Sequence, residues 1–435
     1  KEYNIIILNF SEVNMNNAFK PADILVPKKS VDMNNWSVIA CDQYTSEPEY
    51  WKQTSKIVGQ NYSSLNLILP EIYLEDENVK EKIENIHKNM DKYLSDDIFD
   101  EYKNSMIYVE RIQSNGILRA GIVGMIDLEE YDFSKGSTSQ VRATEATVIE
   151  RIPPRIKVRD GALLELPHIM ILIDDENNTV IEPFANLKSE MKKLYNFELM
   201  QNGGKISGYL IDDQKCSEII RSLDMLGNPE KFSRKYGCSD VLLYAMGDGN
   251  HSLATAKEFY EQLKRNNPEK DFSNHPARYA LAEIVNLHSP ALQFEAIHRI
   301  ITDTDTDILI KTMNNELQIS EKQSEQSFMY IVNGKEHTAY IHNQTSNLTV
   351  GSLQKFLDSY LTENSGKIDY IHGKDTVKKL ANQKNSIGFI LPDMSKSQLF
   401  PTVIKDGALP RKTFSMGHAQ DKRYYIECRK IKDIQ

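Results

Sequence analysis

One short polar loop, Gly247–Ser252, carries the densest group of chemically active side chains in the sequence. Within six residues it offers a carboxylate, an amide, an imidazole and a hydroxyl, from Asp248, Asn250, His251 and Ser252. Gly247 and Gly249 permit positive φ and let a ligand approach the backbone closely. Phosphate or another anion is the ligand that such a loop favours. The same residues also fit a turn in which Asp248 or Asn250 only caps a helix.

The stretches on either side of this loop indicate how it is held. Val241–Met246 is an apolar run typical of a buried strand, and apolar residues recur at helical spacing from Leu253 to Leu263. A strand, a tight loop and a helix start direct free backbone N–H groups and the positive end of a helix at one point. The spacing is neither the Walker nor the Rossmann pattern.

Two basic segments could face the same ligand. The first, Val141–Arg159, has one lysine and four arginines, which are Arg142, Arg151, Arg155 and Arg159. Its basic residues alternate with Ile and Val, which predicts a half-buried segment whose arginines need carboxylate or phosphate partners. The second is the pair Arg411 and Lys412, beside Thr413 and Ser415. Solvated surface charge is the alternative interpretation of both segments.

Composition excludes several classes of protein. The net charge of −10 over 435 residues argues against nucleic acid or an anionic membrane as the main partner. The four cysteines show no C-x-x-C spacing, so we expect neither a zinc site nor a secreted disulfide framework, and a reducing cytoplasm is the expected location. No stretch approaches 18 apolar residues, and Ile5–Leu8 is too short for a signal-peptide core. The sequence does not predict an oligomeric state.

The expected elements form no regular βαβ alternation, so we predict an α+β fold of mixed sheets, hairpins and packed helices around a strand-loop-helix core that resembles a phosphate site. Ser114–Gly116 lies between two apolar runs and predicts a hairpin. A second hairpin is expected from Leu166–Asp174 and Thr179–Phe184, followed by a helix over Ala185–Tyr195. We expect two regions, 1–204 with the basic segment and 205–435 with the loop, or alternatively one intertwined domain.

The sequence resembles the uncharacterised domain-of-unknown-function family numbered 1015. The family's D-G-H-H-R loop is matched by Asp248–Ser252, and its T-H-R element by Ile297–Arg299. Its R-H-E-x-T segment and the arginine about eight residues later are matched by Ala143–Thr147 and Arg155. The chain departs from the pattern at three positions: Asn250 and Thr144 replace histidines, and Ser252 replaces an arginine. Chemistry that needs those three residues is therefore in doubt here.

The D-G-H-H-R loop is itself similar to the phosphate-facing loop of the ParB/sulfiredoxin-like fold, which includes nucleotide hydrolases, sulfiredoxins and free-serine kinases. This similarity implies that the chain binds a purine nucleotide with Mg²⁺ and transfers a phosphoryl group to a small hydroxyl compound, such as a serine-like amino acid. No cysteine lies in the loop, which disfavours sulfinate repair. The alternatives are a nucleotide- or metabolite-binding regulatory protein without turnover, and a hydrolase of phosphate esters or nucleotides.

Phosphoryl transfer requires charge neutralisation, positioning and a base near the acceptor. We expect Glu145 to act as the base and Asp248 to contact Mg²⁺ or the ribose, although the reverse assignment also fits. The full set of expected catalytic residues is Asp248, Glu145, His251 and His298. The expected ligand- and phosphate-binding residues are Gly247, Gly249, Asn250, Ser252, Arg142, Thr147, Arg151, Arg155, Arg299, Arg411 and Lys412.

Overall fold

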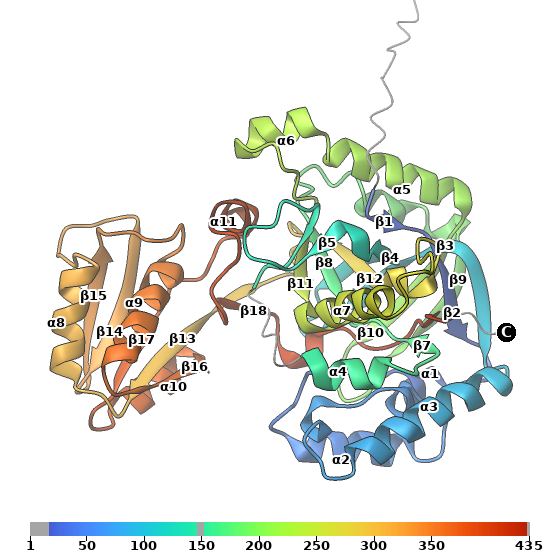
Figure 1. Cartoon of the computed structure of the whole chain (residues 1–435), viewed down its shortest axis with the longest axis horizontal. Helices are drawn as coiled ribbons and strands as arrows, with labels where there is room; N and C mark the ends of the chain where they lie inside the picture. The colour runs from blue at the N-terminus through green and yellow to red at the C-terminus, as the bar shows by residue number, and fades with distance from the viewer. Residues whose placement is uncertain (1–16, 146–151, 433–435) are drawn as a thin grey trace, which may run out of the picture.

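A mixed sheet of eleven strands organises the larger body of the molecule (Figure 1). The computed structural model describes residues 17–145 and 152–432. In chain order the strands are β1 (Phe19–Lys20), β2 (Ala22–Pro27), β3 (Phe99–Ile112), β4 (Leu118–Asp127), β5 (Tyr131–Asp132), β6 (Val141–Arg142), β8 (Met170–Ile173), β9 (Lys192–Glu198), β10 (Lys205–Ile211), β11 (Tyr244–Asp248) and β12 (Tyr279–Asn286). Their order across the sheet is β5-β6-β11-β8-β12-β4-β3-β10-β9, with β1 paired to β4 and β2 to β3.

The directions of three neighbouring strands decide which loops meet. β8 is antiparallel to β11 and parallel to β12. The start of β8 therefore lies beside the end of β11, and Met170 pairs with Asp248. His168, two residues before β8, is consequently placed next to the loop that follows β11.

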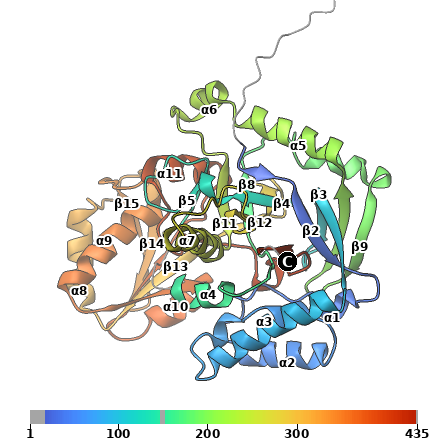
Figure 2. The same cartoon turned by 45° about the vertical axis from the view of Figure 1, so that its right-hand side comes forward.

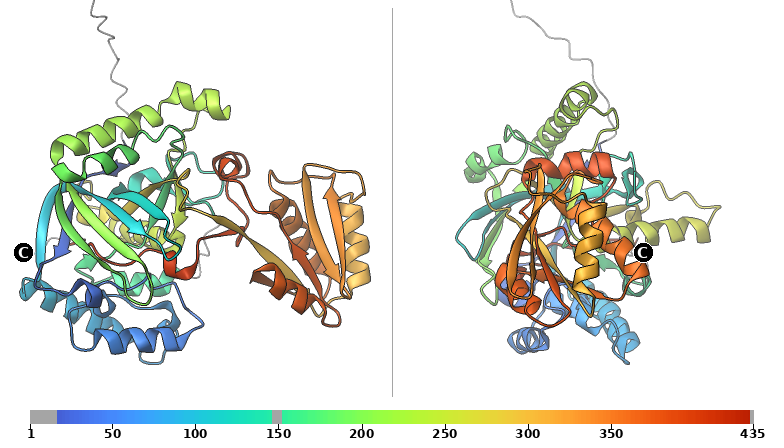
Figure 3. Two further views of the ribbon diagram at one scale, coloured as in Figure 1. Left: turned by 180° about the vertical axis from the view of Figure 1, so that it is seen from behind. Right: turned by 90° about the vertical axis from the view of Figure 1, so that its left-hand side faces the viewer.

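A second sheet forms a smaller lobe, seen from behind in Figure 3. Its strands are β13 (Phe294–Thr302), β14 (Gln326–Val332), β15 (Lys335–Ile341), β16 (Lys367–His372), β17 (Ile387–Ile390) and β18 (Phe414–Met416). β13 pairs with β18 over Phe294–Ala296 and with β16 over Ile297–Thr302. β13 thereby connects the larger body to the smaller lobe.

The helices cover both sheets. They are α1 (Met33–Trp36), α2 (Pro48–Val58), α3 (Val79–Ser95), α4 (Ile152–Arg159), α5 (Asp213–Leu226), α6 (Pro229–Tyr236), α7 (Asn250–Asn266), α8 (Thr306–Glu316), α9 (Thr349–Glu363), α10 (Lys374–Ala381) and α11 (Leu399–Asp406). Two further strands, β7 (Leu164–Glu165) and β19 (Arg429–Lys430), pair with each other. α4 packs against α7, which Figure 2 shows nearly end-on. Leu253, Ala256 and Tyr260 bury one face of α7.

The α+β class, the β3–β4 hairpin at Ser114–Gly116 and the strand-loop-helix around residue 248 are confirmed. Two expected elements are wrong. Residues 179–184 form no strand, because the Asp175 carboxylate accepts the N–H groups of Thr179 and Val180 at 2.6 and 2.9 Å and turns the chain. The expected helix Ala185–Tyr195 is replaced by short 3₁₀ turns and by β9, whose pairing with β10 overrides helix propensity.

The expected boundary at residues 204 and 205 falls within the hairpin of β9 and β10, so paired strands of one sheet lie on both sides of it. The alternative of an intertwined arrangement fits this pairing, and the division into two regions stays a prediction. Within the described part of the chain, no helix has the length and apolar character needed to cross a bilayer.

Candidate functional site

The loop between β11 and α7 has the conformation that its glycines permit. The pairing register of β11 with β8 shifts between Met246 and Asp248, which places a bulge at Gly247. Gly249 has a φ of 81° and precedes the first residue of α7, Asn250. The N-cap residue Gly249 provides no side-chain cap for this 17-residue helix in the described part of the chain. The N–H groups of its first turn and its positive end therefore face the loop.

Two side-chain oxygens at this helix start are buried without a hydrogen-bond partner among the described residues, Asp248 Oδ2 and Asn250 Oδ1. The Nζ of Lys422 lies 3.5 Å from Asp248 Oδ2, and both side chains are largely buried. A buried polar atom without a partner costs about 1–3 kcal/mol. The site therefore favours a ligand that brings a donor or a cation. Oxygen atoms are also the donors that Mg²⁺ prefers, so this pair fits the expected metal.

Lys422 links three acidic side chains that are far apart in the sequence. Besides contacting Asp248, its charge acts on Asp42 and Glu145. Burial raises the pKa of Glu145 above its ordinary value, and nearby lysines offset only part of that rise. Burial also acts to raise the pKa of Asp42, but neighbouring charges, led by His168, hold it below its ordinary value. The charge of Lys422 thus acts on both Glu145 and Asp42, and its ammonium group contacts Asp248.

Glu145 is held by a turn near the C-terminus. The backbone N–H of Leu409 donates to the Thr144 carbonyl at 2.7 Å, in a parallel bridge at Glu145. The backbone N–H groups of Lys412 and Thr413 favour the ionised form of the Glu145 carboxylate and so act to lower its pKa. Lys412 has a φ of 57°, the left-handed conformation that turns the chain toward the carboxylate. Lys412 therefore acts on Glu145 through its backbone and its charge.

Arg299 holds the other side of this turn. Its guanidinium donates to Gln354 Oε1 at 3.0 Å, to the Lys412 carbonyl at 2.9 Å and to the Arg411 carbonyl at 3.1 Å, and also to the Ile297 carbonyl. Four of the five N–H donors of this guanidinium are therefore engaged by the protein. Burial lowers the pKa of Arg299 to about 10. These contacts make Arg299 a positioning residue for the turn, and its expected role in phosphate binding stays a prediction.

The other basic residues expected at the site lie in different surroundings. Arg142 is buried and donates to the carbonyls of Ser139 and Asp240, at 2.7 and 2.9 Å. Arg155 forms an ion pair with Glu71. Arg411 is exposed, with its NH2 group 3.8 Å from Asp358 Oδ1. Thr147 and Arg151 lie outside the described residues.

The two expected catalytic histidines lie on different elements. His251 is half-buried in the first turn of α7, where its carbonyl accepts the Thr255 hydroxyl at 2.7 Å. His298 lies on β13 and is 2% exposed, and its Nδ1 accepts the Leu391 N–H at 3.2 Å. Burial and the charge of Lys374 lower the pKa of His298 to about 4. His298 is therefore neutral near pH 7, and its catalytic role stays a prediction.

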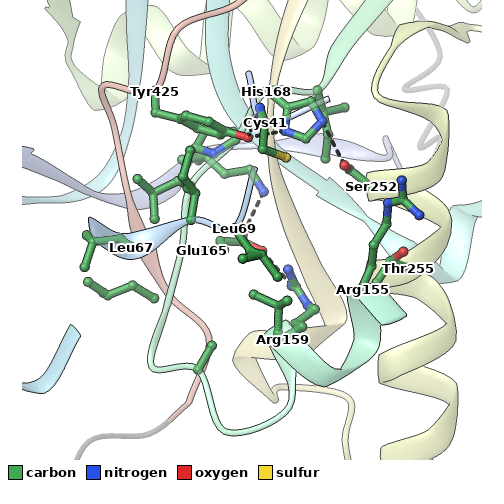
Figure 4. Close-up of a pocket in the computed structure, with 18 of the residues that line it drawn as sticks. Cys41, Leu67, Leu69, Arg155, Arg159, Glu165, His168, Ser252, Thr255 and Tyr425 are labelled. Carbon is green, nitrogen blue, oxygen red and sulfur yellow. Dashed lines mark hydrogen bonds and ion pairs between the residues drawn. The ribbon is translucent and has the colours of Figure 1, made fainter. Parts of the chain in front are cut away.

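Ser252 points to a histidine that the sequence did not single out (Figure 4). Its Oγ lies 2.8 Å from His168 Nε2, and His168 Nδ1 lies 2.8 Å from the Tyr425 hydroxyl. Asp42 Oδ2 lies 3.9 Å from the same Nε2. The charge of Lys422 acts on Asp42, and Lys422 also contacts Asp248. Lys422 therefore connects this group of side chains to the Asp248 carboxylate.

A cavity of about 160 Å³ opens beside Ser252 (Figure 4). α7 contributes Ser252 and Thr255 to its wall, and α4 contributes Arg155 and Arg159. Most of the remaining lining is aliphatic, with His168, Tyr425 and Cys41 at one end. The loop thus faces an anion-favouring helix start and a separate small chamber.

Sequence reasoning missed Asp42, His168, Lys422 and Tyr425. Asp42 follows an apolar run and begins a polar loop, which is the pattern that drew attention to Gly247–Ser252. His168 directly precedes the apolar run that becomes β8. Lys422 and Tyr425 carry no local signal, because the tail reaches the site only in the folded chain.

Comparisons with known proteins give one family and several weak structural similarities. A family model described as "Protein of unknown function (DUF1015)" matches residues 25–360. No curated protein matches the chain. Similar solved structures include a conserved hypothetical protein from Pyrococcus furiosus (11% identity, TM-score 0.34, 71% of this chain and 94% of that chain). A free serine kinase in complex with AMP (11%, 0.36, 71% and 90%) and SbnI with C-terminal truncation from Staphylococcus aureus (8%, 0.35, 68% and 82%) are also similar. TM-scores below 0.5 support no conclusion about the chemistry of this chain.

Proposed function

The chain belongs to the family of proteins of unknown function DUF1015, whose model matches more than half of it, and we propose that it is a nucleotide-dependent phosphotransferase acting on a small hydroxyl compound. The observation that carries the proposal is the contact of Lys422 with Asp248 at the start of α7, together with the effect of the same lysine's charge on the buried Glu145. A helix start and a lysine attract a phosphate group, and a buried carboxylate beside them supplies a base.

The phosphate-binding part consists of the α7 N–H groups and Lys422. The N-cap residue Gly249 gives the first-turn N–H groups no side-chain cap, and we propose that, within the part of the chain that the structure describes, these groups are available to phosphate oxygens. The Lys422 ammonium already neutralises one carboxylate and adds positive charge to a region where Asn250 and Ser252 replace the family's histidine and arginine. Lys422 thus supplies part of the positive charge that is lost where Asn250 and Ser252 replace the family's histidine and arginine.

Glu145 fits the role of general base for the acceptor hydroxyl. Its raised pKa makes it a stronger proton acceptor than an ordinary carboxylate, while the nearby Lys412 and Thr413 N–H groups favour its ionised form. A binding protein without turnover has no need for such a base. The buried carboxylate therefore favours the enzyme over the purely regulatory alternative.

Asp248 Oδ2 and Asn250 Oδ1 are the atoms that would hold Mg²⁺. When bound, the ion would neutralise negative charge on phosphate oxygens. The residues of the chain would then orient the nucleotide and accept the proton of the acceptor hydroxyl.

A ³¹P NMR experiment tests the proposal. The protein is incubated with ATP or ADP, Mg²⁺ and a pool of hydroxyl metabolites that includes L-serine, and new phosphate esters and free phosphate are followed over time. We expect a phosphate ester to appear in step with loss of the nucleotide phosphate. Free phosphate without an ester would identify a hydrolase. Nucleotide binding without any turnover would identify a binding protein, and both results would overturn the phosphotransferase.

A further inference from the structure

The cavity beside Ser252 has aliphatic walls. Eleven of its lining residues are aliphatic or methionine: Leu67, Ile68, Leu69, Leu74, Met90, Val158, Ala162, Leu164, Leu166, Ile169 and Leu281. Its volume, about 160 Å³, is close to that of an apolar cavity of about 150 Å³ that stays dry and binds benzene. The aliphatic part of the wall favours an apolar group of about six non-hydrogen atoms as the occupant.

The charged residues in the wall are already paired. Arg159 NH2 lies 2.6 Å from Glu165 Oε2, and Glu165 Oε1 accepts Arg429 Nε at 2.8 Å. Arg155 is paired with Glu71. A zwitterionic ligand such as a free amino acid would bring two further charges into this mostly aliphatic wall, and burying charged groups there is unfavourable. The body of the preferred ligand is therefore uncharged.

The polar end of the cavity offers an acceptor to a hydroxyl donor. Ser252 Oγ lies 2.8 Å from His168 Nε2, and His168 Nδ1 lies 2.8 Å from the Tyr425 hydroxyl, which accepts the Cys41 N–H at 3.1 Å. A hydroxyl has one donor and two acceptor lone pairs. Whichever of His168 and Ser252 donates in their hydrogen bond, at least one lone pair of Ser252 Oγ therefore remains for a donor, such as the O–H of a ligand.

We propose that this cavity binds a small aliphatic alcohol, with its hydrocarbon body among the leucines and its hydroxyl donating to Ser252. The identification of this alcohol as the phosphoryl acceptor rests on the proposed function, whereas its binding does not. The proposal narrows the acceptor class from serine-like amino acids to compounds with an uncharged, branched aliphatic body.

Binding of 3-methylbutan-1-ol tests the proposal, measured by saturation-transfer NMR and calorimetry on the full chain without nucleotide. Its methyl ether, which lacks the O–H donor, and L-serine are the comparison ligands. We expect saturable binding of the alcohol, weaker binding of the ether and no competition by L-serine. Ser252→Ala should weaken alcohol binding about threefold to tenfold, as for loss of one hydrogen bond, and leave ether binding unchanged.

Two variants fill the cavity in different ways, in case one fails to fold. Ala162→Leu adds volume to the wall beside Arg159, and Val158→Phe adds volume from α4. Both should abolish alcohol binding, whereas Ile308→Phe, an equivalent enlargement at an exposed position on α8, should leave it intact. Thermal unfolding of each variant verifies folding.

The outcomes separate the two proposals. Absence of saturable alcohol binding to the wild type, or unchanged binding in both filled variants, would overturn the cavity assignment. Phosphoryl transfer to L-serine without alcohol binding would overturn this assignment and leave the phosphotransferase standing. Alcohol binding without phosphoryl transfer to any acceptor would support the cavity and overturn the proposed function.

Discussion

The Nζ of Lys422 lies 3.5 Å from the Oδ2 of Asp248, and this contact joins the C-terminal tail to the loop that starts α7. Lys422 lies beyond residue 360, where the match to the family model ends. Lys412 and Thr413, whose N–H groups face Glu145, also lie beyond it. The tail thus contributes groups to both carboxylates of the proposed site.

Lys422→Met tests this contribution, because methionine keeps an apolar stem and removes the charge. We expect the affinity for ATP or ADP to fall about 10- to 100-fold, as for loss of a charged hydrogen bond of about 1.5–3 kcal/mol. Isothermal titration calorimetry with both nucleotides measures the change. Lys379→Met, at an exposed position on α10, is the matched control. Equal loss in both variants would show that general charge, rather than this contact, attracts the nucleotide.

Asp248→Asn should abolish phosphoryl transfer while leaving the fold intact. The amide keeps the size of the side chain but removes the negative charge that faces Lys422 and the proposed Mg²⁺. The Asp248 carboxylate lies 3.5 Å from its ionic partner Lys422. Because this contact is long, we expect its loss to change the thermal unfolding temperature little. Turnover is followed by ³¹P NMR beside Asp100→Asn, an exposed position on β3. Unchanged turnover in Asp248→Asn would refute the assignment of this carboxylate.

The loop was predictable because its signals are local. Val241–Met246, Gly249 and the helical repeat from Leu253 are neighbours in the sequence, and the structure confirms the strand, the turn and the helix that they predict. The incorrect helix arose where a distant contact decides the structure. Lys192–Glu198 becomes a strand because β10 pairs with it, and nothing within the segment itself indicates that partner.

The candidate site was predictable in part for the same reason. Chemistry and family order pointed to Glu145 and Asp248; in the folded chain the charge of Lys422 acts on Glu145 and its ammonium group contacts Asp248, and the catalytic roles of both carboxylates stay predictions. Lys422 itself stood out in no pattern, since an isolated lysine in a tail is usually solvated. His168 was overlooked because its importance depends on β8 running antiparallel to β11, which a single sequence does not reveal.

Glu145 should control the pH dependence of turnover. A base must be ionised, so the rate should rise with pH through the pKa of Glu145, which burial places above its ordinary value of 4.5. Glu145→Gln should reduce turnover by about 10²–10⁴-fold. It should also remove the fall of the rate at acid pH, here called the acid limb of the pH profile. The measurement is turnover between pH 4.5 and 8, with Glu84→Gln, exposed on α3, as control. An acid limb that persists in Glu145→Gln would assign the base elsewhere.

His298 should make the fold less stable in acid. Its pKa of about 4 lies below the ordinary value of 6.5, so the unfolded chain takes up a proton between these values and the folded chain does not. The contribution of His298 to the free energy of unfolding is therefore fully present above pH 6.5. It decreases by up to about 3 kcal/mol as the pH falls to 4.

The variant His298→Asn retains an acceptor for the Leu391 N–H and removes the titrating imidazole. Urea unfolding at pH 7 and pH 4.5 should show a smaller acid-induced loss in this variant, by about 2–3 kcal/mol. His342→Asn, an exposed histidine of the same lobe, is the control and should retain the wild-type loss. Identical losses in wild type and His298→Asn would show that protonation of His298 does not limit stability.

Gly249→Ala tests whether the backbone at the start of α7 positions the ligand. Gly249 has a φ of 81°, and a Cβ there would lie 3.2 Å from Ile169 Cα and 3.5 Å from His168 Cδ2. Gly237, which ends α6, has a φ of 67° with no atom within 4 Å of an added Cβ. Alanine at either position costs about 1–2 kcal/mol for the left-handed backbone. Only Gly249→Ala should also displace the helix start and weaken nucleotide binding in calorimetry. If Gly237→Ala weakens binding as much, the loss reflects global destabilisation and the loop geometry has no special part in it.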